Sequence, residues 1–209
     1  VLFRSDFQAE LDPPYRRLRE LAAARRTEEA TGGVRWLNLP LPPDTVPASS
    51  GNAGKGRGWS ADFVPLGENI REWTQLVSVQ GLPRSKSAGQ ALALLEGMQT
   101  ARAKRCGVAA GPVESLRWSD GQSGETLQTL LICPQVPDTN FAELAVVKAI
   151  EGPDYLYVIQ RTWRLPAADA DTLRANSRGP QAAAEAFLAD VRLCNPAGDT
   201  SGCPAPFPR

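Results

Sequence analysis

The 209-residue sequence contains no histidine, and this absence removes several kinds of chemistry. Without imidazole the chain has no histidine-based catalytic triad and no histidine metal ligand. It also has no side chain whose unperturbed pKa lies near neutrality. We therefore expect no metal ion and no cofactor, and we assign no catalytic residue.

An excess of either charge is also missing, as are long apolar runs. Lys and Arg together number 23, as do Asp and Glu, so the formal net charge is zero. A neutral chain has no long-range field that attracts phosphate backbones or anionic lipids, which argues against a nucleic-acid partner. No apolar run approaches the roughly 18–20 residues that cross a bilayer, so we expect no transmembrane segment.

Cysteine is present four times, as Cys106, Cys133, Cys194 and Cys203. Each lies at the edge of a predicted element and none belongs to a Cys-x-x-Cys pair, which favours two disulfides in an oxidising compartment over a metal site. Four cysteines allow three pairings. We favour Cys106 with Cys133, which would join a helix to the sheet, and Cys194 with Cys203. A reactive thiol and reduced cytosolic thiols are the alternatives.

The chain divides into segments of different composition. Residues 1–5 match the translation of a sequencing-adapter end, so we expect them to be non-native; the alternative is a natural apolar start. If they are non-native, a natural signal peptide or anchor can have been lost before them. Residues 6–33 have the pattern of a charged helix. Residues 34–58 are rich in Pro, Gly and Ser and predict a flexible linker. Residues 196–209 form a Pro-rich tail, which leaves residues 59–195 as the folded domain.

The folded domain has patterns typical of paired strands and two helices. In chain order we expect a strand that begins at Phe63-Val64, a strand at 73–80, and a helix that Ser85 or Ser87 caps and Gly107 closes. Hairpin strands at 113–119 with 125–133 and at 141–150 with 155–163 follow, and then a helix over 180–193. Sequential hairpins favour antiparallel pairing. The sequence thus predicts an α+β fold: an antiparallel sheet of about five to six strands with two helices packed on one face, plus an N-terminal helix and a Pro/Gly-rich linker.

Aromatic residues recur on the last predicted strand. Tyr155, Tyr157, Arg161 and Trp163 lie at alternating positions and share one face of that strand. If this face is open, it is a candidate binding face for peptide, glycan or protein, and Arg161 would stack on an aromatic ring or pair with a carboxylate. The alternative is that the aromatic side chains fill the core.

Carboxylates offer the remaining candidate chemistry. Six of them are scattered singly or beside predicted turns: Glu68, Glu72, Glu114, Asp120, Glu125 and Glu143. A glycosidase-like pair forms only in the folded chain, and nothing in the sequence selects two of these residues. A solvated surface is the simpler interpretation.

The stretch from Phe63 to Gln80 carries a resemblance. It contains Pro65-Leu66-Gly67-Glu68, then Trp73-Thr74, then Val77-Ser78-Val79-Gln80. It resembles uncharacterised secreted or periplasmic bacterial envelope proteins with a Pro-x-Gly-Glu, Trp-Thr and Val-x-Gln signature, over about residues 59–195. The order of elements is more loosely similar to the PsbP-like α/β sandwich. These likenesses imply a binding or assembly role and transfer no catalytic residue.

Together these observations predict a non-enzymatic periplasmic or secreted protein of the bacterial cell envelope, which acts as a binding or accessory module. Its partner would be a protein or another envelope component. The alternative is a carboxylate-based hydrolase, which requires a deep cleft with two close Asp or Glu residues.

Overall fold

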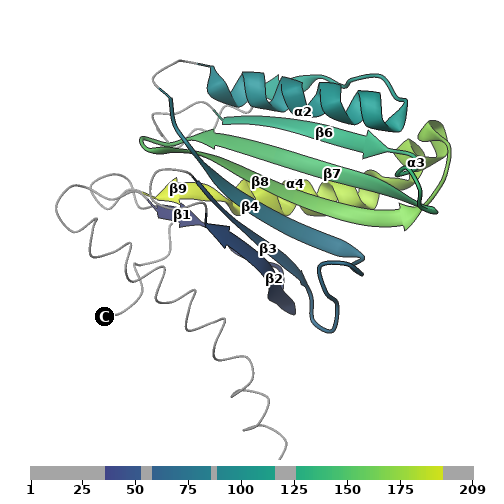
Figure 1. Cartoon of the computed structure of the whole chain (residues 1–209), viewed down its shortest axis with the longest axis horizontal. Coiled ribbons are helices and arrows are strands. Elements are labelled where there is room, and N and C mark those ends of the chain that lie inside the picture. Colours follow the sequence, from purple (N-terminus) through teal and green to yellow (C-terminus); the bar gives the residue numbers. More distant parts are fainter. Residues whose placement is uncertain (1–35, 53–57, 86–88, 116–125, 195–209) are drawn as a thin grey trace, which may run out of the picture. The chain divides into compact units, whose positions relative to one another are not determined.

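The computed structural model describes residues 36–52, 58–85, 89–115 and 126–194 (Figure 1). The predicted N-terminal helix, the turn at 116–125 and the Pro-rich tail with Cys203 lie outside these residues. The chain divides into two compact units, and Leu37–Leu193 form the one described below. Of the other unit, only Trp36 and Cys194 are among the described residues.

A seven-stranded antiparallel sheet organises this unit, with strand order β2-β3-β4-β8-β7-β6-β5. The strands are β2 (Thr45–Asn52), β3 (Trp59–Pro65), β4 (Gln75–Pro83), β5 (Val113–Ser115), β6 (Thr126–Cys133), β7 (Phe141–Glu151) and β8 (Tyr155–Pro166). A separate two-stranded sheet pairs β1 (Trp36–Asn38) with β9 (Arg192–Cys194). The predicted hairpin of β7 with β8 is confirmed, and the N–H of Gly152 donates to the carbonyl oxygen of Tyr155 across its turn at 2.9 Å.

Two long helices pack on opposite faces of the sheet, not on one face as predicted. Helix α2 (Gln90–Cys106) runs along β6 in Figure 1, whereas α4 (Arg178–Asp190) contacts β7 and β8. Alternate residues of β7 serve the two cores, because Val147 packs in the cluster with Leu95 of α2 and Val146 packs in the cluster with Leu188 of α4. Almost every residue of β7 is therefore buried, a pattern typical of a strand covered on both faces.

The segment 34–58, predicted to be a linker, contains two strands: β2 adds a seventh strand to the large sheet, and β1 pairs with β9 in the separate two-stranded sheet. Strand β2 contains no charged residue and pairs only with β3, at the edge of the sheet. Pro47 is tolerated there because an edge strand leaves one side of its backbone unpaired, and the register shifts between Pro47 and Ser49. Proline, serine and glycine therefore do not exclude a strand at this edge.

Helix α2 ends as the sequence predicts but begins differently. Gly107 follows it in the left-handed conformation, with φ at 64°. At the other end Gly89 occupies the cap position with no side-chain cap, instead of Ser85 or Ser87. The buried carboxylate of Glu151 accepts a hydrogen bond from the N–H of Ala91 in the first turn, at 3.1 Å. Glu151, 60 positions further along the chain than Ala91, therefore takes the capping role that the sequence predicts for Ser85 or Ser87.

A short helix, α3 (Ala170–Asn176), precedes α4 and was not predicted. It follows Asp169, whose carboxylate accepts hydrogen bonds from the N–H groups of Asp171 and Thr172. No helix within the described residues is long and apolar enough to cross a membrane.

Candidate functional site

The predicted aromatic face on β8 lies beneath α4. Tyr157 and Trp163 are 5% and 8% exposed, and both belong to the core cluster that contains Phe187 of α4. Tyr155 is half-buried and packs against the same cluster. These side chains therefore fill the core, which is the alternative left open by the sequence.

Arg161 lies on the same face and joins α4 to the sheet. Its guanidinium donates to the carbonyl oxygen of Ala183 at 2.9 Å and to Oε1 of Gln75 at 3.3 Å. It also stacks over the rings of Trp163 and Phe187, 4.7 and 5.6 Å from their centroids. Burial lowers the pKa of Arg161 below its usual value, because the charged form loses hydration. The residue is an internal tether between α4 and the sheet.

The disulfide predicted between Cys106 and Cys133 is present, with an S–S distance of 2.04 Å and Cα atoms 5.2 Å apart. It joins the last residue of α2 to the last residue of β6. Cys194 is also disulfide-bonded, whereas Cys203 lies outside the described residues. The described part of the chain has no free cysteine, so it offers no reactive thiol.

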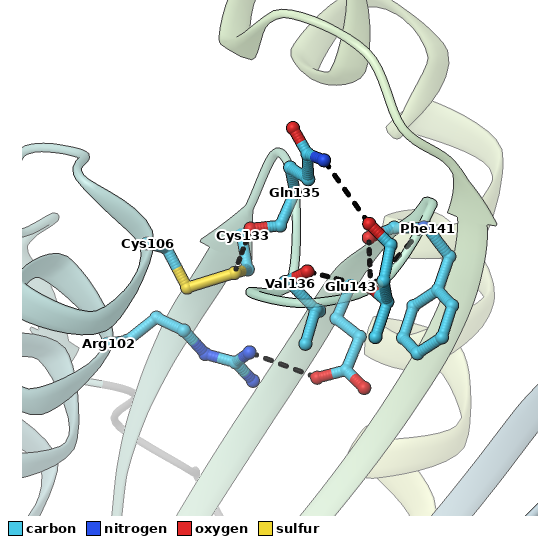
Figure 2. The surroundings of a disulfide bond; sticks show 8 residues. Arg102, Cys106, Cys133, Gln135, Val136, Phe141 and Glu143 are labelled. Carbon is cyan, nitrogen blue, oxygen red and sulfur yellow. Dashed lines mark hydrogen bonds and ion pairs between the residues drawn. A yellow bond between two sulfur atoms is a disulfide. The ribbon is translucent and has the colours of Figure 1, made fainter.

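An ion-pair cluster lies next to this disulfide. Figure 2 shows Arg102 reaching from α2 to Glu143, with a nitrogen–oxygen distance of 3.0 Å. Arg164 approaches the other oxygen of Glu143 at 3.5 Å, and its guanidinium lies over the rings of Trp73 and Phe141. The cluster therefore links α2, β7 and β8 at one end of the sheet.

The mostly buried carboxylates are not arranged as an acid pair. Glu151 is held by Arg84, at 3.1 Å, and by the first turn of α2. Glu143 lies eight residues earlier on the same strand, and at about 3.3 Å per residue the two positions are roughly 26 Å apart. Among the described residues no group of three or more Cys, Asp or Glu could hold a metal ion. Glu143 and Glu151 therefore do not form the close carboxylate pair that the hydrolase alternative requires.

The Pro-x-Gly-Glu and Trp-Thr parts of the signature lie in the β3–β4 loop, residues 65–74, and the Val-x-Gln part lies on β4. The carboxylate of Glu68 accepts two hydrogen bonds from Thr74, one from its N–H at 2.6 Å and one from its hydroxyl at 2.7 Å. Within that closure, Oδ1 of Asn69 accepts the N–H groups of Arg71 and Glu72 at 2.9 and 3.1 Å. The loop is therefore closed at its base by a carboxylate and shaped inside by an asparagine turn.

This closed loop exposes two aliphatic side chains. Leu66 and Ile70 are 54% and 40% exposed, and the only other large exposed hydrophobic residue in the described part of the chain is Leu92 on α2. Arg164 donates to the carbonyl oxygen of Arg71 at 3.1 Å and so ties the loop to β8. This segment carries the resemblance noted in the sequence, but no pattern in the sequence predicts the closed shape of the loop.

A cavity of about 210 Å³ lies at the opposite edge of the sheet, lined by residues of α2, β5, β6, β7 and α4 and by the segment that precedes β5. Strand β5 pairs only with Leu127–Thr129 of β6. Cys106 is bonded to Cys133 at the end of β6, and β5 begins at Val113. The intervening residues 107–112 therefore pass alongside residues 130–133 of β6, which β5 does not pair with. The N–H of Gly111 donates to Oε1 of Gln99 at 3.1 Å, which holds this segment against α2. No motif in the sequence predicts this cavity.

Comparison of the chain with models of known protein families finds no match, and comparison with curated proteins finds none either.

Proposed function

We propose that this chain is a non-enzymatic binding module that engages a protein partner through the β3–β4 loop. The observation that carries the proposal is the exposure of Leu66 and Ile70 on a loop whose base is closed by Glu68 and Thr74. Single exposed aliphatic residues are common and need no explanation. Two of them on one short loop with its own hydrogen-bond network favour a recognition element.

The apolar pair would contribute measurably to binding. Fully burying an exposed Leu or Ile side chain is worth about 1.5–3 kcal/mol, and Leu66 and Ile70 are 54% and 40% exposed, so the pair would supply about 1.5–3 kcal/mol in total, or roughly tenfold to a hundredfold in affinity. A loop that is already ordered loses less conformational entropy when it binds. The exposed side chains of Arg71 and Glu72 flank the apolar pair and would form the polar rim of the contact.

The proposed location is the periplasm or the exterior of a bacterial cell. The Cys106–Cys133 disulfide supports it, because such bonds persist mainly in oxidising compartments. The resemblance of the loop sequence to envelope proteins points the same way. The partner we propose is an envelope protein with an apolar cleft that accepts the loop tip.

Site-specific photo-crosslinking tests the proposal. A photoreactive phenylalanine analogue replaces Ile70 in one variant and Leu92 in a control, because the two residues are 40% and 39% exposed but lie on different elements. Each protein is irradiated in bacterial envelope extract. We expect a discrete adduct from position 70 that is absent from position 92 and disappears when Glu68→Ala opens the loop. Equal adducts from both positions, or none from position 70, would refute the proposal.

A further inference from the structure

Gln128, on β6, is a buried amide without a protein partner. The residue is 9% exposed and lines the cavity at the edge of the sheet, and its side chain makes no hydrogen bond to any described residue. The oxygen and nitrogen atoms of its amide are not fully sealed from solvent, so they face accessible space. Buried amides in proteins nearly always have a hydrogen-bond partner. An amide left open to a cavity can form its hydrogen bonds with water or with a ligand bound there.

The charges around Gln128 define the chemistry of that ligand. Glu114 lies directly opposite Gln128 in the β5–β6 register, and Glu185 of α4 lines the same cavity. Neither carboxylate forms an ion pair with a described residue; Glu185 accepts one hydrogen bond, from Nε2 of Gln181 at 2.8 Å. Within the described residues, therefore, the cavity is lined by two exposed carboxylates that are paired with no cation.

The nearby cations are already engaged. Arg102 is the only basic residue among those that line the cavity, and it pairs with Glu143. Lys148 is the β7 neighbour of Gln128, but its ammonium donates to the carbonyl oxygens of Leu188 and Val191, each at 2.7 Å. Neither side chain is available to balance Glu114 and Glu185.

The rest of the wall on this face is aliphatic. Leu130 and Ile132 follow Gln128 at alternate positions of β6, and Val146 is the register partner of Leu130. The three side chains therefore lie on the same face of the sheet as Gln128. An aliphatic stem would contact these side chains, and a terminal ammonium would bind the amide oxygen of Gln128 and the carboxylates that line the same cavity.

We propose that this cavity binds a primary amine on an aliphatic stem. A volume of about 210 Å³ is below the roughly 300–1,000 Å³ of ordinary small-molecule pockets, so a single lysine side chain or a short alkylamine is the right size. The site is separate from the β3–β4 loop, and it does not depend on the function proposed for that loop.

The test measures binding to the full chain by calorimetry and by chemical-shift perturbation of the Gln128 amide. The probes are n-pentylamine, n-pentanol, and an acetylated Gly-Lys-Gly amide with its norleucine analogue. We expect an amine to bind at least about tenfold more tightly than its uncharged counterpart, because the alcohol and norleucine cannot pair with the carboxylates. Binding by the lysine peptide alone identifies a partner's side chain as the ligand, and binding by pentylamine alone identifies a free amine.

Variants of the cavity wall provide the second readout. We expect Glu185→Gln and Gln128→Met each to weaken amine binding about tenfold or more, the usual effect of losing one hydrogen bond to a charged group. Glu185 is exposed on α4, so its variant should fold even if Gln128→Met does not. The control Glu96→Gln removes an exposed carboxylate of α2 that does not line the cavity and should leave affinity unchanged. The proposal is overturned if neither amine binds at about 10 mM, if alcohol and amine bind equally, or if Glu185→Gln has no effect.

Discussion

Replacing Cys106 and Cys133 together by alanine should destabilise the protein by about 3.5 kcal/mol. The bond closes a loop with a sequence separation of 27 residues. On the chain-entropy model, a loop of that length gives about 12 cal/mol/K, or about 3.5 kcal/mol at 25 °C. For a folded unit of this size the change corresponds to a fall in Tm of roughly 7–14 °C.

Denaturant titration of the double variant measures this loss directly. Substitution is preferable to a reducing agent, because Cys194 is also disulfide-bonded and would be reduced at the same time. Leu92→Ala changes an exposed side chain of α2 and is the control, with an expected effect within about 0.5 kcal/mol. A loss below about 1 kcal/mol in the double variant would contradict the view that this bond stabilises the fold.

Two further predictions concern a strand glycine and a helix cap. Gly81→Ala should cost about 2–3 kcal/mol in a thermal melt, because its Cβ would overlap the indole ring of Trp59. Gly97→Ala, where nothing lies within 4 Å, should instead stabilise α2 by about 0.5–1 kcal/mol, and equal effects would refute the close approach. The hydrogen bonds from the Thr172 N–H and hydroxyl lower the pKa of Asp169 below its usual value. The hydrogen bonds of this cap therefore stabilise the folded state at a pH above the pKa of Asp169 in the unfolded chain, and this stabilisation is lost as the pH falls through the lower pKa of the folded protein. The Thr172 amide should lose exchange protection in acid, and Asp169→Asn should remove that pH dependence.

Local signals in the sequence predict local structure well. The turn Glu151-Gly152-Pro153-Asp154 correctly predicts the β7–β8 hairpin, and Gly107 correctly predicts the end of α2. The pairing of Cys106 with Cys133 is also correct, because both cysteines lie at the ends of elements that were predicted correctly. In each case the residues that determine the structure are close in sequence or have a distinctive chemistry.

The features that were predicted wrongly depend on distant contacts. The prediction that both helices pack on one face was wrong. The pattern of apolar residues along a strand indicates which of its faces are buried, but it does not indicate which helix covers each face. Strand β2 was missed because its pairing with β3, and not its own composition, makes it a strand. The cap of α2 was assigned to a local serine, whereas the carboxylate that fills this role is Glu151 on β7.

The candidate sites show the same division. The aromatic residues of β8 share a face as predicted, but α4 covers that face, and this depends on tertiary packing. Glu68 and Thr74 are only six residues apart, yet a carboxylate that closes a loop has no motif of its own in a single sequence. Gln128 could not be selected at all, because its significance comes from the absence of a partner in the folded chain.

Amide hydrogen exchange at Thr74 tests most directly whether the β3–β4 loop is ordered before it meets a partner. We predict strong protection of this amide in the wild-type protein and about a tenfold to hundredfold loss in Glu68→Ala, because its hydrogen bond to a carboxylate is removed. Glu72→Ala removes a carboxylate of the same loop for which no side-chain hydrogen bond is present among the described residues, so it should leave the protection intact. Rapid exchange at Thr74 in the wild-type protein would contradict the account, because Leu66 and Ile70 would then not be held in place for binding.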